Sequence, residues 1–152
     1  MKQKNILFVC KYNRFRSRVA EAYFNKINKN KDIQAKSAGI IKGWVPLDEN
    51  EVEVTKEFGL DITGEPTALS TDLLKNTNKI IIVADNVQVS LFDDIAIADN
   101  SSIKFNKESK VILWGIKDES LSDKDNIKRI IEAIIKEVDK LNKDLETKRI
   151  KL

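Results

Sequence analysis

The residues best suited to chemistry lie close together near the start of the chain. Cys10 is the only cysteine in the 152-residue sequence, and five residues separate it from Arg16, which Ser17 follows. The apolar run over residues 6–9 predicts a buried parallel strand that ends at Cys10, and residues 18–27 are typical of a helix. A tight loop therefore joins a strand to the N-terminus of a helix, which is where open α/β sheets bind their ligands.

This spacing favours a nucleophile beside an anion-binding loop. A helix N-terminus presents unpaired backbone N–H groups and a positive dipole end, and successive N–H groups in residues 11–16 can surround an anion. The Arg16 guanidinium can bind two phosphate oxygens, and the same positive field favours the thiolate form of Cys10. Ser17 can donate its hydroxyl to that thiolate and can also cap the helix, and Asn13 tolerates the left-handed backbone of a tight loop. The pattern indicates attack by Cys10 on the ester of a tetrahedral oxyanion, although a lone cysteine at a strand end is more often a small core residue.

The loop sequence resembles the phosphate-binding loop of low-molecular-weight protein tyrosine phosphatases and of their relatives, the thioredoxin-coupled arsenate reductases. That family carries the pattern Cys-x-Gly-Asn-x-x-Arg-Ser. Four residues match it (Cys10, Asn13, Arg16 and Ser17), whereas Tyr12 stands at the family's glycine. The resemblance implies that Cys10 and Arg16 are catalytic. It also implies a phosphate-binding loop formed by Lys11, Tyr12, Asn13, Arg14, Phe15, Arg16 and Ser17.

The rest of the chain alternates strands and helices, which predicts an α/β fold. We expect one three-layer domain over residues 1–152, with a parallel sheet covered by helices on both faces. Strands are predicted at residues 4–9, 33–38, 79–84 and 111–114. Helices are predicted at residues 17–28, 47–58 and 70–76, and a last helix, capped by Ser122 or Asp123, precedes a basic tail at residues 148–152 that is expected to fray. The resemblance implies a flavodoxin-like strand order of 2-1-3-4.

A general acid must protonate the leaving group of a phosphate ester. Because the sequence contains no histidine, this acid must be a carboxylate, a lysine or a tyrosine. The resemblance implies an aspartate in the loop before the last helix, which Asp118 matches, with Glu119 in place of the family's usual proline. Asp118 would protonate the leaving oxygen and then act as base for the water that hydrolyses the cysteinyl-phosphate. The alternative is that Asp118, Glu119, Asp123 and Asp125 are helix-capping or solvated acids.

Aromatic walls around the site would favour an aryl phosphate as the substrate. Tyr12 and Trp44 are the candidates, although Trp44 can equally pack on the core, and Asp85 either lines the same pocket or caps a turn. The thioredoxin-coupled reductases use two further cysteines, which this sequence lacks. We therefore expect a phosphatase acting on phosphotyrosine in a phosphorylated protein or on a small aryl phosphate, with inorganic phosphate or another oxyanion as product or inhibitor. The alternatives are an arsenate reductase that needs an external thiol and an oxyanion-binding module without turnover.

Composition narrows the remaining classes. A net charge of +3 is too small to argue for a nucleic-acid partner. No apolar stretch approaches the roughly 20 residues of a membrane span, and the chain starts without a secretory signal pattern, so we expect a cytoplasmic location and no membrane partner. One cysteine excludes an internal disulfide bond and a cysteine-rich metal site. We expect neither a metal nor another cofactor.

Overall fold

The computed structural model describes residues 3–43, 45–92, 110–117 and 123–152. Within these residues, the centre is a four-stranded parallel sheet in the order β2-β1-β3-β4, which confirms the implied topology. The strands are β1 (Lys4–Cys10), β2 (Ile33–Gly39), β3 (Lys79–Ala84) and β4 (Val111–Ile116). All four strands end at the same edge of the sheet, and β2 is an edge strand.

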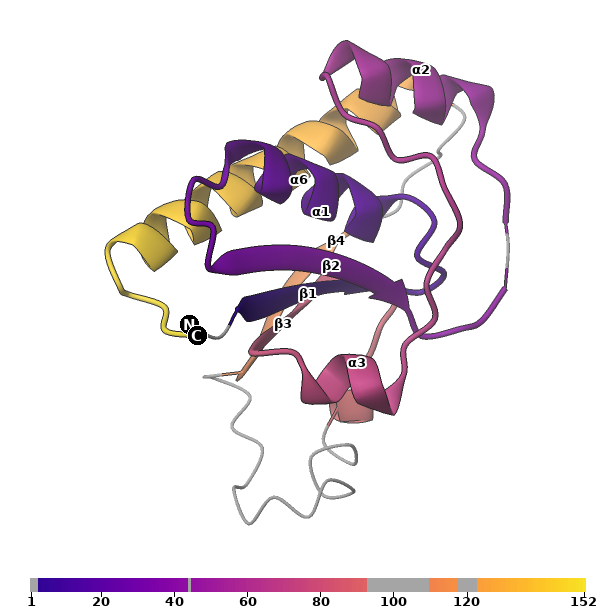
Figure 1. The fold of residues 1–152 in the computed structure, drawn as a ribbon. Helices are drawn as coiled ribbons and strands as arrows, with labels where there is room; N and C mark the ends of the chain where they lie inside the picture. The colour runs from indigo at the N-terminus through magenta and orange to yellow at the C-terminus, as the bar shows by residue number, and fades with distance from the viewer. Residues whose placement is uncertain (1–2, 44, 93–109, 118–122) are drawn as a thin grey trace.

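Helices cover both faces of the sheet (Figure 1). On one face lie α1 (Arg16–Ile27), α2 (Glu49–Glu57) and α6 (Lys124–Glu146), and on the other lie α3 (Thr71–Lys75) and the 3-10 turn η1 (Val89–Phe92). These three layers confirm the predicted α/β, flavodoxin-like fold. Among the described residues, no helix has both the length and the apolar composition that crossing a membrane requires.

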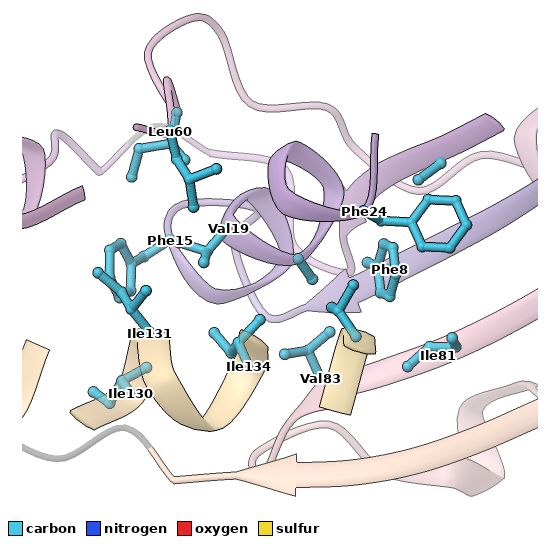
Figure 2. Packing of buried hydrophobic residues seen from close by; sticks show 14 of the residues in the cluster. Phe8, Phe15, Val19, Phe24, Leu60, Ile81, Val83, Ile130, Ile131 and Ile134 are labelled. Atoms are coloured by element: carbon cyan, nitrogen blue, oxygen red, sulfur yellow. The ribbon is translucent and has the colours of Figure 1, made fainter. Parts of the chain in front are cut away.

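Alternate side chains of β1 enter two separate cores. Ile6 and Phe8 pack with α1 and α6 in the larger core, while Leu7 and Val9 pack with α3 and η1 in the smaller one. This division follows because successive side chains of a strand point to opposite faces of the sheet. Figure 2 shows the larger core, in which the rings of Phe8 and Phe24 lie 6.2 Å apart between centroids. The central strand is thus fixed from both sides, and so is Cys10 at its end.

The apolar stripe of α6 closes the larger core. Its buried residues recur at steps of three and four, the spacing of one helix face: Ile127, Ile130, Ile131, Ile134, Val138 and Leu141. Asp123 caps this helix and accepts the backbone N–H of Asp125 at 2.9 Å. One of the two predicted caps is therefore confirmed, and the other, Ser122, lies outside the described residues.

Two expectations from the sequence need correction. Helix α2 begins at Glu49, after the capping residue Asp48, and not at residue 47, because the Asp48 side chain ends the preceding loop by accepting a helical N–H group. The tail at residues 148–152, which was expected to fray, contacts the rest of the fold. Ile150 donates its backbone N–H to the carbonyl of Asp144, and its side chain packs against the larger core.

Candidate active site

The loop between β1 and α1 lies at the carboxyl edge of the sheet. Cys10 ends β1 and Arg16 begins α1. Asn13 has a φ angle of 54°, the left-handed conformation that this residue type tolerates. In the part of the chain that the structure describes, the backbone N–H groups of residues 11–15 donate no hydrogen bond to the protein. These groups are available to an anion, which is the arrangement that an anion-binding loop requires.

Asn13 holds this loop from within. It is 1% exposed and donates its amide nitrogen to the hydroxyls of Ser17 and Ser37, both at 2.9 Å. Its amide oxygen accepts the backbone N–H of Thr67 at 2.7 Å. Ser37 in turn donates its hydroxyl to Glu21 of α1 at 2.7 Å. One buried side chain therefore ties the loop to α1, to β2 and to the segment before α3.

The end of β2 lies so close to the loop that only glycine fits there. A Cβ atom added to Gly39 would lie 2.5 Å from the backbone nitrogen of Asn13 and 2.5 Å from the carbonyl carbon of Tyr12. Gly39 is also held by its N–H, which donates to the carbonyl of Thr67 at 2.9 Å. The sequence analysis did not assign Gly39 this role.

Cys10 and Ser17 face each other at the base of the loop. The Cys10 Sγ and Ser17 Oγ atoms are 2.9 Å apart, and both residues are buried. Because Asn13 donates to the Ser17 oxygen, the Ser17 proton is left to point toward the sulfur, and a Cys10 thiolate can only accept it. Ser17 does not cap α1: the capping position is Phe15, which makes no side-chain capping bond, so the expectation that Ser17 also caps the helix is wrong.

Arg16 joins the loop to the ends of β3 and β4. The residue is 5% exposed, and its Nη1 donates to the Ile116 carbonyl at 2.6 Å and to Asp85 Oδ1 at 3.1 Å. Its Nη2 lies 3.4 Å from Asn86 Oδ1. The sequence left Asp85 open between a pocket wall and a turn, and the structure places it against the arginine. Asn86 and Ile116 were missed, although the signal was present: both lie where strands end at the edge that carries Cys10.

The other loop side chains point in different directions. The Lys11 ammonium lies 5.3 Å from the centroid of the Tyr12 ring, a cation–π contact. Phe15 is 3% exposed and belongs to the larger core (Figure 2). The Arg14 guanidinium donates to Glu51 of α2. Phe15 and Arg14 can thus offer an anion only their backbone N–H groups.

Tyr12 lies on the wall of two mainly apolar cavities beside the loop. The larger has a volume of about 360 Å³ and is lined also by Ile41 and Pro66. The smaller has a volume of about 230 Å³ and extends from Tyr12 to Val45 and Leu47. The larger volume is within the range of pockets that hold small ligands. Tyr12 therefore lines two hollows, each next to the loop that would hold the phosphate.

Two predicted site residues, Asp118 and Trp44, lie outside the described residues, as does Glu119. Of the other acids near them, Asp123 caps α6, so for this residue the capping alternative is confirmed. The described residues include no cluster of three or more cysteine, aspartate or glutamate side chains that could hold a metal ion.

The strand order and a cysteine–arginine loop at the carboxyl edge define the class of the protein as a low-molecular-weight phosphatase-type α/β domain. The family comparison agrees with this assignment. The sequence model of the low molecular weight phosphotyrosine protein phosphatase family matches residues 5–151, and the chain belongs to this family.

Relatives with different activities in their names match the chain. The arsenate reductase of Staphylococcus aureus (strain Newman) is 31% identical over 91 residues, which cover 59% of this chain and 67% of the relative. Among solved structures, a low molecular weight protein tyrosine phosphatase from T. tengcongensis has a TM-score of 0.70 and 25% identity, with 93% of this chain and 99% of that chain covered. An arsenate reductase from Archaeoglobus fulgidus has a TM-score of 0.65 and 27% identity, with 90% and 98% covered. Membership of the family is thus compatible with phosphate ester hydrolysis and with arsenate reduction.

Proposed function

We propose that this chain is a cysteine-dependent phosphatase that hydrolyses phosphotyrosine or another aryl phosphate monoester through a cysteinyl-phosphate intermediate. The observation that carries the proposal is the 2.9 Å contact between Cys10 Sγ and Ser17 Oγ, at the base of a loop in which the backbone N–H groups of residues 11–15 donate no hydrogen bond to the described residues. A hydroxyl that donates to a thiolate stabilises it both before attack and when it departs.

The first step forms a bond between sulfur and phosphorus. The loop N–H groups and Arg16 hold the phosphate oxygens, with Arg16 oriented by Asp85 and the Ile116 carbonyl. The Cys10 thiolate attacks phosphorus, and the bond from phosphorus to the aryl oxygen breaks. Asp118, in the role that the resemblance implies, gives its proton to that oxygen, so the phenol leaves as a neutral molecule.

The second step reverses these roles. The Asp118 carboxylate takes a proton from a water molecule, and the water oxygen bonds to phosphorus. The sulfur–phosphorus bond then breaks, inorganic phosphate is released, and Cys10 departs as a thiolate that Ser17 stabilises. The substrate would be a phosphorylated protein or a small aryl phosphate, with Tyr12 and Trp44 as the walls against which the aryl group packs.

Arsenate reduction is the second candidate, because relatives of 31% and 27% identity carry that name. Arsenate has nearly the shape and charge of phosphate, so the same loop would hold it. Since Cys10 is the only cysteine in the sequence, reduction to arsenite would require external thiols to supply two electrons. Assays with and without an added thiol therefore distinguish the two activities, because only arsenate reduction requires the thiol.

The proposal is tested by turnover of phenyl phosphate and para-nitrophenyl phosphate without added thiol. We expect Cys10→Ser to abolish turnover and Asp118→Asn to lower kcat for phenyl phosphate on the order of 10²-fold or more. The Asp118→Asn loss should be smaller with para-nitrophenyl phosphate, whose phenolate leaves more easily. The matched control is Asp32→Asn, which should retain full turnover. Asp32 is an exposed aspartate just before β2, at the end of the sheet opposite to the one that carries Cys10.

Three outcomes would contradict the proposal. Turnover that survives in Cys10→Ser shows that Cys10 is not the nucleophile. Phosphate binding without any turnover by the native protein indicates an oxyanion-binding module. Arsenite formation that depends on added thiol, without ester hydrolysis, indicates the reductase.

A further inference from the structure

Arg14 belongs to the phosphate loop, but its side chain reaches out of the loop to the segment that begins α2. Its Nε donates to the Pro46 carbonyl at 3.1 Å, and its Nη1 donates to Glu51 Oε2 at 2.7 Å. Its Nη2 donates to the other carboxylate oxygen of Glu51. All three guanidinium nitrogens are therefore bonded within residues 46–51, in the two-point geometry that makes arginine–carboxylate pairs strong and specific.

Glu51 has a second task at the start of α2. It is the third residue of a capping box, and its Oε1 accepts the backbone N–H of Asp48 at 2.7 Å. The Glu51 side chain is 0% exposed, whereas that of Arg14 is 18% exposed. A carboxylate buried to this degree requires a partner of opposite charge, which Arg14 provides. The same carboxylate thus fixes where α2 begins and where the phosphate loop lies.

Three successive loop residues are each held by a different part of the fold. Asn13 is bonded to Ser37 of β2, Arg14 to α2, and Phe15 is packed in the larger core. Within the part of the chain that the structure describes, the backbone N–H groups of residues 13–15 donate no hydrogen bond, so they do not hold one another in place. The direction in which these N–H groups point therefore depends on the side-chain contacts of Asn13, Arg14 and Phe15.

We propose that Arg14 and Glu51 are a positioning pair, through which α2 sets the conformation of the phosphate loop and hence its affinity for phosphate. The inference rests on the proposed function in one respect, that the loop binds a phosphate group. The pair is neutral as a whole, so it acts on the anion by placing the N–H groups and Arg16, and only weakly by its charge. Loss of the link should therefore weaken phosphate binding even where the net charge and the fold are retained.

The double variant Arg14→Met/Glu51→Gln tests this proposal. It removes one charge of each sign, and the glutamine oxygen can still accept the Asp48 N–H. Replacing both members of a buried ion pair is often neutral for stability, whereas Arg14→Met alone leaves a buried carboxylate unpaired and should lower the melting temperature. The matched control is Glu53→Gln on the same helix, because Glu53 forms an exposed ion pair with Lys124 at 2.9 Å.

The measurements are the dissociation constant for inorganic phosphate by calorimetry, kcat and KM for para-nitrophenyl phosphate, and the melting temperature. We expect the double variant to bind phosphate about tenfold more weakly and to lose kcat/KM to a similar degree, since misplaced groups cost binding and turnover together. Glu53→Gln should match the native protein in all three. An unchanged phosphate affinity in a folded double variant overturns the proposal and leaves the pair a purely structural contact.

Two further cases are the failure of the double variant to fold and the absence of ester hydrolysis by the native protein. If the double variant does not fold, Arg14→Lys replaces it, because lysine keeps the charge and loses the two-point contact. Weaker phosphate binding at a native melting temperature then supports the pair, and native binding overturns it. If the native protein binds phosphate without hydrolysing esters, the phosphatase proposal fails, while the phosphate measurements still decide the role of Arg14 and Glu51.

Discussion

Replacing Gly39 with alanine should disable the phosphate loop without touching any reacting group. Gly39 ends β2, and the backbone of Tyr12 and Asn13 passes directly over it. The atoms that a new Cβ would meet are backbone atoms of the loop, which cannot rotate away as a side chain can. Either the loop or the end of β2 must move.

The size of this movement can be worked out from the contact distances. The added Cβ would lie 2.5 Å from two backbone atoms, about 0.9 Å less than the 3.4 Å at which ordinary contact begins. A displacement near 1 Å in catalytic groups lowers turnover by about 10²-fold, which corresponds to about 2.7 kcal/mol in the activation free energy. Overpacking of this kind also lowers the free energy of unfolding by about 1–3 kcal/mol.

The assay is kcat/KM for para-nitrophenyl phosphate with urea unfolding of the same samples. Gly43→Ala is the matched control, because a Cβ added to Gly43 would have, apart from its chain neighbours, no atom of the described residues within 4 Å. We expect a loss of about 10²-fold in kcat/KM for Gly39→Ala and native values for Gly43→Ala. Native turnover in a folded Gly39→Ala variant would refute the idea that β2 positions the loop by close approach.

Three other substitutions each test the role of one side chain. In the proposed mechanism Ser17 donates its hydroxyl to the Cys10 thiolate, and Ser17→Ala removes that hydrogen bond. Because hydrogen bonds to charged groups contribute about 1.5–3 kcal/mol, kcat for para-nitrophenyl phosphate should fall about tenfold or more. Burial lowers the pKa of Lys79, so the unfolded chain binds more protons than the native state as pH approaches 10.5, and the free energy of unfolding rises in that range. Lys79→Met should remove this rise and stabilise the protein at pH 7, as measured by urea unfolding at both pH values. Burial and a hydrogen bond to Asp139 raise the pKa of Tyr23 from 10.0 to about 12. Between these pH values the native state binds more protons than the unfolded chain, so the free energy of unfolding falls as the pH rises. In Tyr23→Phe the free energy of unfolding should fall less steeply with pH in the same experiment. An unchanged slope would contradict the raised pKa of Tyr23.

The side-chain directions of two aromatic residues in the loop could not be predicted from the sequence. Tyr12 and Phe15 are three positions apart, and both were assigned to the phosphate loop. In the structure Phe15 enters the larger core, while Tyr12 faces two cavities. The left-handed turn at Asn13 lies between them and changes the direction of the chain. The direction of a side chain after such a turn depends on what the loop packs against, which local spacing does not contain.

The sequence by itself predicted the strand and helix pattern and, through resemblance, the family and the strand order, and it nominated the loop after Cys10 as the site of the nucleophile. These features are local: an apolar run, a cysteine and an arginine at a set spacing, and helical periodicity each act within a few residues. For Asp118 and Trp44 the sequence prediction still stands alone.

Only the tertiary structure showed what holds the loop. The partners of Arg16 and Arg14, Asp85 and Glu51, lie 69 and 37 positions away along the chain, and Gly39 is in another strand. These contacts arise because parallel strands bring their carboxyl ends to one edge of the sheet, whatever their separation in sequence. Residue types and local spacing could nominate the groups that react, and the packing of distant segments decided how those groups are positioned.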